Sequence, residues 1–199
     1  MDYLFFILIG YLSGSILYAY WIPMIFVHKD ICALSPDGNP GTANAYMYGG
    51  FFAGTAALIM ELLKGFLPVL IASHYLDTNS LLYSLVIVAP VLGHALPLRH
   101  IKRGGKAIAT SFGVLLGIYP VTQPVFFLIV TYISFSLILV IRPHLFRSIV
   151  TFGVFFLLTV IFVPINSVRI AAFGISTIVI LKHLHAYEGE TMTVHLLHS

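Results

Sequence analysis

The sequence predicts an all-α integral membrane protein with about seven transmembrane helices, with the N-terminus outside and the C-terminus in the cytoplasm. Three observations support this prediction. The chain of 199 residues is 59% hydrophobic and 9% charged, which is too little charge to cover the surface of a soluble protein. Its apolar residues gather in long segments, and about 20 such residues let a helix cross a bilayer. Its lysines and arginines are concentrated in the loops on one side of these segments.

The apolar segments form one predicted domain, residues 1–199, because no linker or repeat divides them. Helices are expected because open strand edges leave backbone groups unpaired in lipid. In addition, the runs of Leu, Ile, Val and Phe do not alternate as barrel strands do. The predicted spans are 3–27, 45–75, 81–98, 107–119, 121–141, 145–163 and 165–182, followed by a cytoplasmic tail, 183–199.

The first and fourth segments differ from an average span. Residues 3–27 lack charge, and the preceding Met1-Asp2 lacks the basic stretch of a cleaved signal peptide, so this segment is predicted to remain as a helix. Residues 107–119 are too few to cross upright. They form either a half-helix or one helix with the fifth segment across Pro120, which leaves five or six spans as alternatives.

The charges set the predicted orientation. With the N-terminus outside, eight of the ten lysines and arginines lie in cytoplasmic loops or at their edges. They are Lys29, Arg99, Lys102, Arg103, Lys106, Arg142, Arg147 and Lys182. The formal net charge of +3 therefore reflects topology, and no nucleic-acid partner is expected. A single cysteine excludes an internal disulfide.

Three of the ionisable residues inside the spans are candidates for a special role: Glu61, Lys64 and His94. Glu61 and Lys64 are three residues apart, share a helix face and can neutralise each other. His94 lies near the cytoplasmic end of the third segment, so a site residue and a hydrogen-bonded interior histidine are both open interpretations. The histidines of the tail lack a metal-ligand spacing, so no metal site is expected there.

Two cytoplasmic loops are candidates for anion binding. In Asp37–Asn44 (DGNPGTAN), Thr42 or Asn44 is expected to cap the next helix, whose first N–H groups favour anions. In Gly104-Gly105-Lys106, backbone N–H groups can form an anion nest beside a lysine. An ordinary interfacial loop and a positive-inside turn, respectively, are the alternatives. The second loop is not a Walker loop, because its spacing is wrong and no strand precedes it.

Four stretches together resemble the bacterial PlsY family. They are YLSGS (Tyr11–Ser15), GNPGTAN (Gly38–Asn44), ELLKG (Glu61–Gly65) and GHALPLRHIKRGGKAIATSFGVLLGIYP (Gly93–Pro120), in the family's order and spacing. Members are integral-membrane enzymes of phospholipid synthesis that transfer an acyl group from acyl phosphate to glycerol 3-phosphate, giving lysophosphatidate.

The resemblance implies a site for two phosphates on the cytoplasmic face of the bacterial plasma membrane. It implies catalytic roles for Ser15, His94 and His183. It implies substrate-binding roles for Asn39, Gly41, Asn44, Gly104, Gly105, Lys106 and Thr110. The implied partners are acyl phosphate, glycerol 3-phosphate and membrane lipids, without metal or cofactor, and the resemblance does not fix the oligomeric state.

The chain departs from the family pattern near the same site. Asp37 stands where a serine is expected, Ala107 replaces a glycine, and Cys32-Ala33-Leu34 occupies a stretch that usually carries an arginine. The residues after His183 also differ. Two alternatives to the acyltransferase follow: a catalytically weakened member that binds an anionic lipid or partner, and a small membrane anion carrier. The lack of inverted repeats argues against the carrier.

Overall fold

The structure is a computed structural model that describes residues 2–99 and 104–197. In this part of the chain, four helical segments are long and apolar enough to cross a membrane. They are Asp2–Val27, Phe51–Tyr75, His144–Phe162 and Asn166–His185. Three shorter apolar helices are Tyr83–Ala95, Ile108–Gly117 and Gln123–Ile138. These segments correspond in order to the seven predicted ones, which confirms the all-α class; the number of crossings stays a prediction.

The first segment is interrupted, although the sequence predicted one continuous helix over 3–27. Helix α1 (Asp2–Gly14) ends before α2 (Tyr18–Val27), and Leu17 between them has a non-helical ψ of 76°. The carbonyl of Ile16 accepts a hydrogen bond from Lys64 Nζ at 2.7 Å, and Ala19 N–H donates to Glu61 Oε1 at 3.1 Å. A break inside an apolar segment needs such partners for its backbone groups. They come from another helix, so local sequence does not reveal the break.

The second segment is also divided. After α3 (Ile31–Leu34), α4 (Thr42–Gly49) and α5 (Phe51–Tyr75) replace the single predicted helix over 45–75. Gly50 separates them with a φ of 88°, a left-handed value that glycine adopts without steric cost.

The middle of the chain contains α6 (Tyr83–Ala95), α7 (Ile108–Gly117) and α8 (Gln123–Ile133). Helix α7 ends before Pro120, so the fourth segment is a separate short helix and is not continuous with the fifth. Helix α8 continues as a π-helical turn, Ser134–Ile138, and the chain then forms strand β1 (Leu139–Arg142). The prediction that a helix continues to residue 141 is therefore wrong.

The last two helices, α9 (His144–Phe162) and α10 (Asn166–His185), pack against each other. Strand β2 (Thr193–Leu196) then returns to pair antiparallel with β1, with Leu139 opposite Leu196 and Arg142 opposite Thr193. Local patterns do not predict this ribbon, because 50 residues separate its strands.

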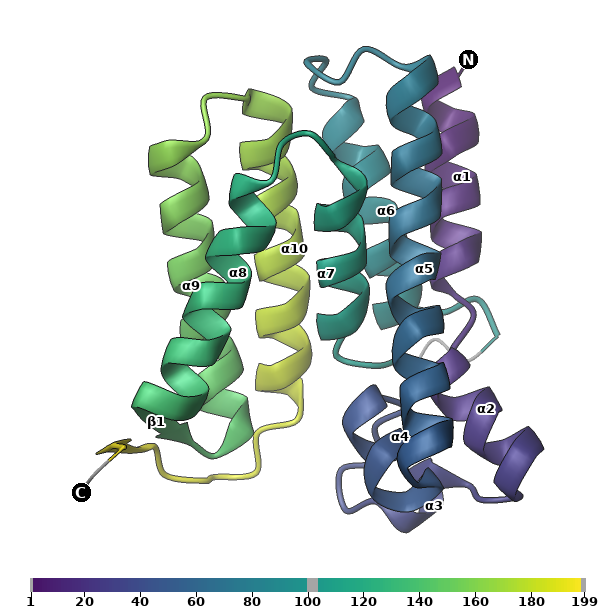
Figure 1. Cartoon of the computed structure of the whole chain (residues 1–199), viewed down its shortest axis with the longest axis vertical. Helices are drawn as coiled ribbons and strands as arrows, with labels where there is room; N and C mark the ends of the chain where they lie inside the picture. Colours follow the sequence, from purple (N-terminus) through teal and green to yellow (C-terminus); the bar gives the residue numbers. More distant parts are fainter. Residues whose placement is uncertain (1, 100–103, 198–199) are drawn as a thin grey trace.

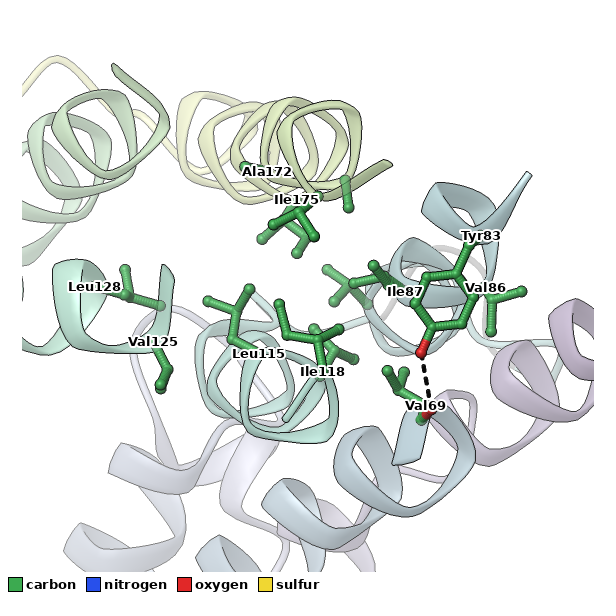
Figure 2. Packing of buried hydrophobic residues seen from close by; sticks show 14 of the residues in the cluster. Val69, Tyr83, Val86, Ile87, Leu115, Ile118, Val125, Leu128, Ala172 and Ile175 are labelled. Atoms are coloured by element: carbon green, nitrogen blue, oxygen red, sulfur yellow. Dashed lines mark hydrogen bonds between the residues drawn. The ribbon is translucent and has the colours of Figure 1, made fainter. Parts of the chain in front are cut away.

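A shared apolar core fixes the arrangement of the helices. Helices α5, α6, α7, α8 and α10 contribute fully buried side chains such as Val69, Ile87, Leu115, Leu128 and Ile175 (Figure 2). The buried Tyr83 hydroxyl donates to Val69 O at 3.1 Å, which satisfies its polar end. Figure 1 shows α2, α3, α4 and β1 at one end of the bundle and the N-terminus at the other. The C-terminal strand lies at the same end as β1.

Candidate functional site

A cavity of about 730 Å³ lies where α4, α7 and α9 begin, and the first residues of all three helices line it. No side chain caps any of these three helix starts by hydrogen bonding. The first N–H groups of a helix lack intrahelical partners and carry the positive end of its dipole. Three such ends beside one cavity favour an anionic ligand.

The structure brings five of the ten predicted site residues to the wall of this cavity: Asn39, Gly41, Asn44, His94 and Lys106. Gly105 lies directly behind His94, Gly104 lies against Ala95 O, and Thr110 donates to the cavity-lining Glu61. Ser15 and His183 do not line the cavity. The Ser15 hydroxyl donates to Tyr11 O at 2.8 Å, and His183 is fully buried. Lys102 and Arg103 of the basic loop lie outside the described residues.

The loop before α4 is organised by Asp37. Its carboxylate accepts hydrogen bonds from Asn39 N–H at 3.2 Å and from the Asn44 side-chain amide at 2.9 Å. The same Asn44 amide also donates to Asn39 O at 2.9 Å. The prediction that Thr42 or Asn44 caps α4 is therefore wrong: Gly41 is the N-cap residue, and Asn44 folds the loop.

Asp37 is ionised at neutral pH and pairs with Lys106, whose Nζ lies 2.8 Å from Asp37 Oδ2. Burial by itself raises the pKa of the Asp37 carboxyl, but hydrogen bonds from Lys106 and Asn44 and the charge of Lys106 lower it to about 2. The two candidate anion loops are thus joined by one ion pair.

The Gly104-Gly105-Lys106 loop packs tightly on the end of α6. Gly105 N–H donates to His94 O at 3.1 Å, and a Cβ atom at Gly105 would collide with His94 Nε2. Glycine is required at this position because no side chain fits. Ala107, which stands where the family has glycine, is left-handed with a φ of 60°. Such a conformation costs an L-residue roughly 1–2 kcal/mol.

A buried polar cluster forms the inner wall. Lys64 Nζ lies 2.7 Å from Glu61 Oε2, which confirms the predicted pairing of these two residues. His94 Nδ1 lies 2.8 Å from Lys64 Nζ and 3.0 Å from Glu61 Oε2, and Thr110 Oγ1 donates to Glu61 Oε2 at 3.2 Å. The family motifs that contain Glu61, His94 and Thr110 meet at this carboxylate.

Sequence reasoning missed two residues of the opposite wall. Tyr132 and His144 line the cavity, with 3.2 Å between Tyr132 Oη and His144 Nε2. The His144 ring stacks on His183 with 5.5 Å between centroids, which places His183 one residue behind the wall. One signal could have indicated His144: Pro143 marks a helix start on the same predicted side as both candidate loops.

The last residue of α10, His185, and the segment after it close one side of the cavity; the segment contributes Ala186, Glu188 and Glu190. Among the described lining residues, Lys106 is the only lysine or arginine, against four carboxylates: Asp37, Glu61, Glu188 and Glu190. Glu61 and Asp37 have cationic partners, whereas Glu188 and Glu190 face the cavity without an ion pair among the described residues. An anion that enters therefore meets favourable helix ends and unfavourable acidic side chains.

Comparison with known proteins places the chain in a family. The family model described as glycerol-3-phosphate acyltransferase matches residues 4–189. A glycerol-3-phosphate acyltransferase of Macrococcus caseolyticus (strain JCSC5402) is 35% identical over 178 residues, 89% of this chain and 87% of that protein. One from Streptococcus pyogenes serotype M1 is 41% identical over 120 residues, 60% of this chain and 55% of that protein.

Two solved structures are similar to the fold. The glycerol 3-phosphate form of PlsY, an integral membrane glycerol 3-phosphate acyltransferase, has a TM-score of 0.80 and 26% identity, and the match covers 93% of this chain and 90% of that one. The lysophosphatidic acid form has a TM-score of 0.76 and 26% identity, with 93% and 89% covered. The chain therefore belongs to the glycerol-3-phosphate acyltransferase family, as its four motifs predicted.

Proposed function

We propose that this chain transfers a fatty acyl group from acyl phosphate to glycerol 3-phosphate, giving lysophosphatidate and phosphate. One observation carries this proposal: the family's loop residues and three uncapped helix starts meet at one cavity beside Lys106. The PlsY structures of the same fold are a glycerol 3-phosphate form and a lysophosphatidic acid form. Both molecules carry a phosphate, which suits these helix ends.

The reaction needs mainly positioning and neutralisation of charge. A hydroxyl of glycerol 3-phosphate attacks the acyl carbonyl carbon, the bond from that carbon to the phosphate oxygen breaks, and the hydroxyl proton leaves with the phosphate. Phosphate is a good leaving group, so no covalent acyl-enzyme is required. Lys106 and the backbone N–H groups around the cavity would hold phosphate oxygens and stabilise the charge that develops on them.

Asn39 and Asn44 would maintain the loop that carries Asp37, through the hydrogen bonds described above. His94 would orient the substrate from the cavity wall, and His183 would act indirectly, through the His144 ring on which it stacks. The residues behind the wall would have supporting roles: Ser15, Gly104, Gly105 and Thr110. The acyl chain would extend between helices toward lipid, since apolar side chains such as Leu116, Phe126 and Leu157 are exposed on the bundle.

The proposed location is the bacterial plasma membrane, with the cavity facing the cytoplasm. Basic residues cluster at the cavity end of the bundle: Lys29 follows α2, Arg142 ends β1, and Lys182 lies in the last turn of α10. Arg169, in the first turn of α10, lies at the opposite end of that helix. Such an asymmetry is typical of a cytoplasmic face.

Turnover by the purified protein tests this function. Incubated with acyl phosphate and glycerol 3-phosphate, the chain is expected to release lysophosphatidate and phosphate in equal amounts, and acyl-coenzyme A is expected not to replace acyl phosphate. Binding of glycerol 3-phosphate without either product would instead support the catalytically weakened family member. The carboxylates of the cavity favour this alternative, because they repel anionic substrates. Anion flux in proteoliposomes without product would support a carrier.

A further inference from the structure

The three donors of the buried Lys64 ammonium determine how His94 is protonated. Lys64 Nζ lies within hydrogen-bond distance of three groups: Ile16 O and Glu61 Oε2, both at 2.7 Å, and His94 Nδ1 at 2.8 Å. The side chain of Lys64 is 1% exposed, so water does not replace any of them. An ammonium has three N–H donors and no acceptor. All three are satisfied only if His94 Nδ1 accepts the third hydrogen bond.

The carboxylate of Glu61 does not need a proton from His94. Its Oε1 accepts from Ala19 N–H, and its Oε2 accepts from Lys64 and Thr110. A proton on His94 Nδ1 could reach Glu61 Oε2 at 3.0 Å, but it would then face the third ammonium proton of Lys64. A buried donor without a partner is costly, and a doubly protonated imidazolium would place two positive charges 2.8 Å apart. His94 is therefore neutral, with its proton on Nε2.

The Nε2 atom is the end of the ring that adjoins the substrate loop. His94 lines the cavity, and Nε2 lies directly against Gly105, whose N–H donates to His94 O. We propose that Lys64 is a positioning residue that holds His94 as a hydrogen-bond donor, through Nε2–H, to an anionic oxygen of the substrate. This proposal rests on the proposed function and sharpens it. Because Nε2 already carries its proton, His94 cannot accept one from the substrate hydroxyl there, which excludes it as the general base.

Two substitutions of His94 separate the ends of its ring. In His94→Gln, the side-chain amide nitrogen can replace Nε2 and keep a donor toward the cavity. In His94→Asn, the amide oxygen can replace Nδ1 and keep the acceptor for Lys64, but no donor reaches the cavity. We expect His94→Gln to keep the KM for glycerol 3-phosphate within about threefold and His94→Asn to raise it about tenfold or more, as for loss of a hydrogen bond to a charged group.

The same two variants give opposite results under other roles. If His94 served only to accept a hydrogen bond from Lys64, His94→Asn would keep a KM closer to that of the unmodified chain than His94→Gln. A general base would lose kcat in both variants to a similar extent and would leave KM largely unchanged. Either pattern would overturn the donor role of His94.

The tautomer can be measured without turnover. Nitrogen-15 NMR of the full chain in detergent, with labelled histidines, gives nine imidazole spin systems, and His94 is the one that disappears in His94→Gln. We expect its Nε2 to be protonated and its Nδ1 bare from about pH 6 to pH 8, a window around the ordinary histidine pKa near 6.5. In Lys64→Met, the proton is expected to move to Nδ1, where Glu61 Oε2 can accept it.

A proton on His94 Nδ1 in the unmodified chain would overturn the proposal, whether or not the protein is active. Conversely, a protonated Nε2 in a protein that makes no lysophosphatidate would leave the tautomer assignment intact and reject the acyltransferase function. Lys64→Met leaves the Glu61 carboxylate buried without its ion pair, a change that can prevent folding. If Lys64→Met does not fold, the proposal is tested by the His94 tautomer of the unmodified chain and by the KM values of His94→Gln and His94→Asn.

Discussion

Asp37 Oδ2 and Lys106 Nζ lie 2.8 Å apart, although 69 residues separate them in the chain. The pair joins the loop before α4 to the loop before α7 at the wall of the cavity. Lys106 is also the only described lysine or arginine among the lining residues. A phosphate that binds Lys106 must therefore compete with Asp37 or share the ammonium with it.

Removal of the Lys106 ammonium is expected to weaken binding of the phosphate in the transition state. A hydrogen bond between charged groups contributes about 1.5–3 kcal/mol, so Lys106→Ala is expected to lower kcat/KM about ten- to hundredfold. Lys106→Arg is expected to restore only part of this loss, because a planar guanidinium replaces a compact ammonium beside two glycines. Steady-state kinetics measures both effects. Lys29→Ala, in an exposed loop away from the cavity, is the control; unchanged kinetics in a folded Lys106→Ala would make this loop a membrane-interface turn only.

Neutralisation of Asp37 is expected to have the opposite effect on glycerol 3-phosphate. Asp37→Asn keeps the shape and the acceptor for Asn39 N–H, and Asp37→Ser restores the family's residue; both free Lys106 and are expected to lower KM. The pKa of Asp37 is about 2, so the charge is present throughout the working range. The difference from the unmodified chain is expected to stay constant from about pH 7 to pH 9, where glycerol 3-phosphate is a dianion, and to decrease as the phosphate gains a proton near pH 6. An increase in KM in both variants would mean that Asp37 orients Lys106 for binding.

The sequence predicted the positions of the helices well where apolar pattern decides them. Helices α6, α9 and α10 begin and end within a few residues of the predicted spans, and the buried pairing of Glu61 with Lys64 followed from their spacing. The break after α1 was not predictable locally. Its free backbone groups are satisfied by α5, so it depends on packing that no single segment encodes.

The part of the site that consists of family motifs was predictable from the sequence. The loops of Asn39 and Lys106 meet at the cavity, and the sequence singled out Asp37 as an acid where a phosphate is expected. The pairing of Asp37 with Lys106, the wall formed by Tyr132 and His144, and the acidic closing segment after α10 depend on contacts between residues far apart in the chain. Spacing rules apply within one helix or loop and do not predict such contacts.

The left-handed residue before α7 can be relieved by a single substitution. Ala107 has a φ of 60° and ψ of 15°, a conformation that glycine adopts without penalty. Ala107→Gly, which restores the family's residue, is expected to stabilise the folded chain by up to about 1 kcal/mol. Relief of the left-handed strain stabilises the folded chain, and the greater flexibility of glycine in the unfolded chain offsets part of this gain. Thermal unfolding in detergent measures this change. Ala109→Gly, two residues later within α7, is the matched control and is expected to destabilise; equal effects of both would contradict the strain at Ala107.

The orientation in the membrane can be tested with single cysteines. After Cys32→Ser, a cysteine at the exposed Asn79, in the α5–α6 connection, is expected to react with an impermeant thiol reagent in intact cells. A cysteine at the exposed Glu188 is expected to react only after lysis, because the tail lies at the end of the bundle where the basic residues cluster. The reverse labelling pattern would place the cavity outside the cell, away from cytoplasmic acyl phosphate.

The acidic segment after α10 is expected to restrict access of anions to the cavity. The family match ends at residue 189, whereas strand β2, held by β1, lies beyond it and anchors the segment that carries Glu188 and Glu190. Truncation after Tyr187 removes the strand and both carboxylates, and it is expected to lower the KM for glycerol 3-phosphate.

A charge-only variant separates the two causes of this restriction. The double substitution Glu188→Gln/Glu190→Gln keeps the segment but removes its charge, and it is expected to lower KM about two- to threefold, the modest effect usual for exposed charges. Its advantage is expected to fade as added salt shortens the screening length to about 3 Å near 1 M. A lower KM in the truncated chain alone would assign the restriction to the strand and its bulk. If neither variant changes KM, the segment covers no path that glycerol 3-phosphate uses, and Glu188 and Glu190 do not oppose its binding.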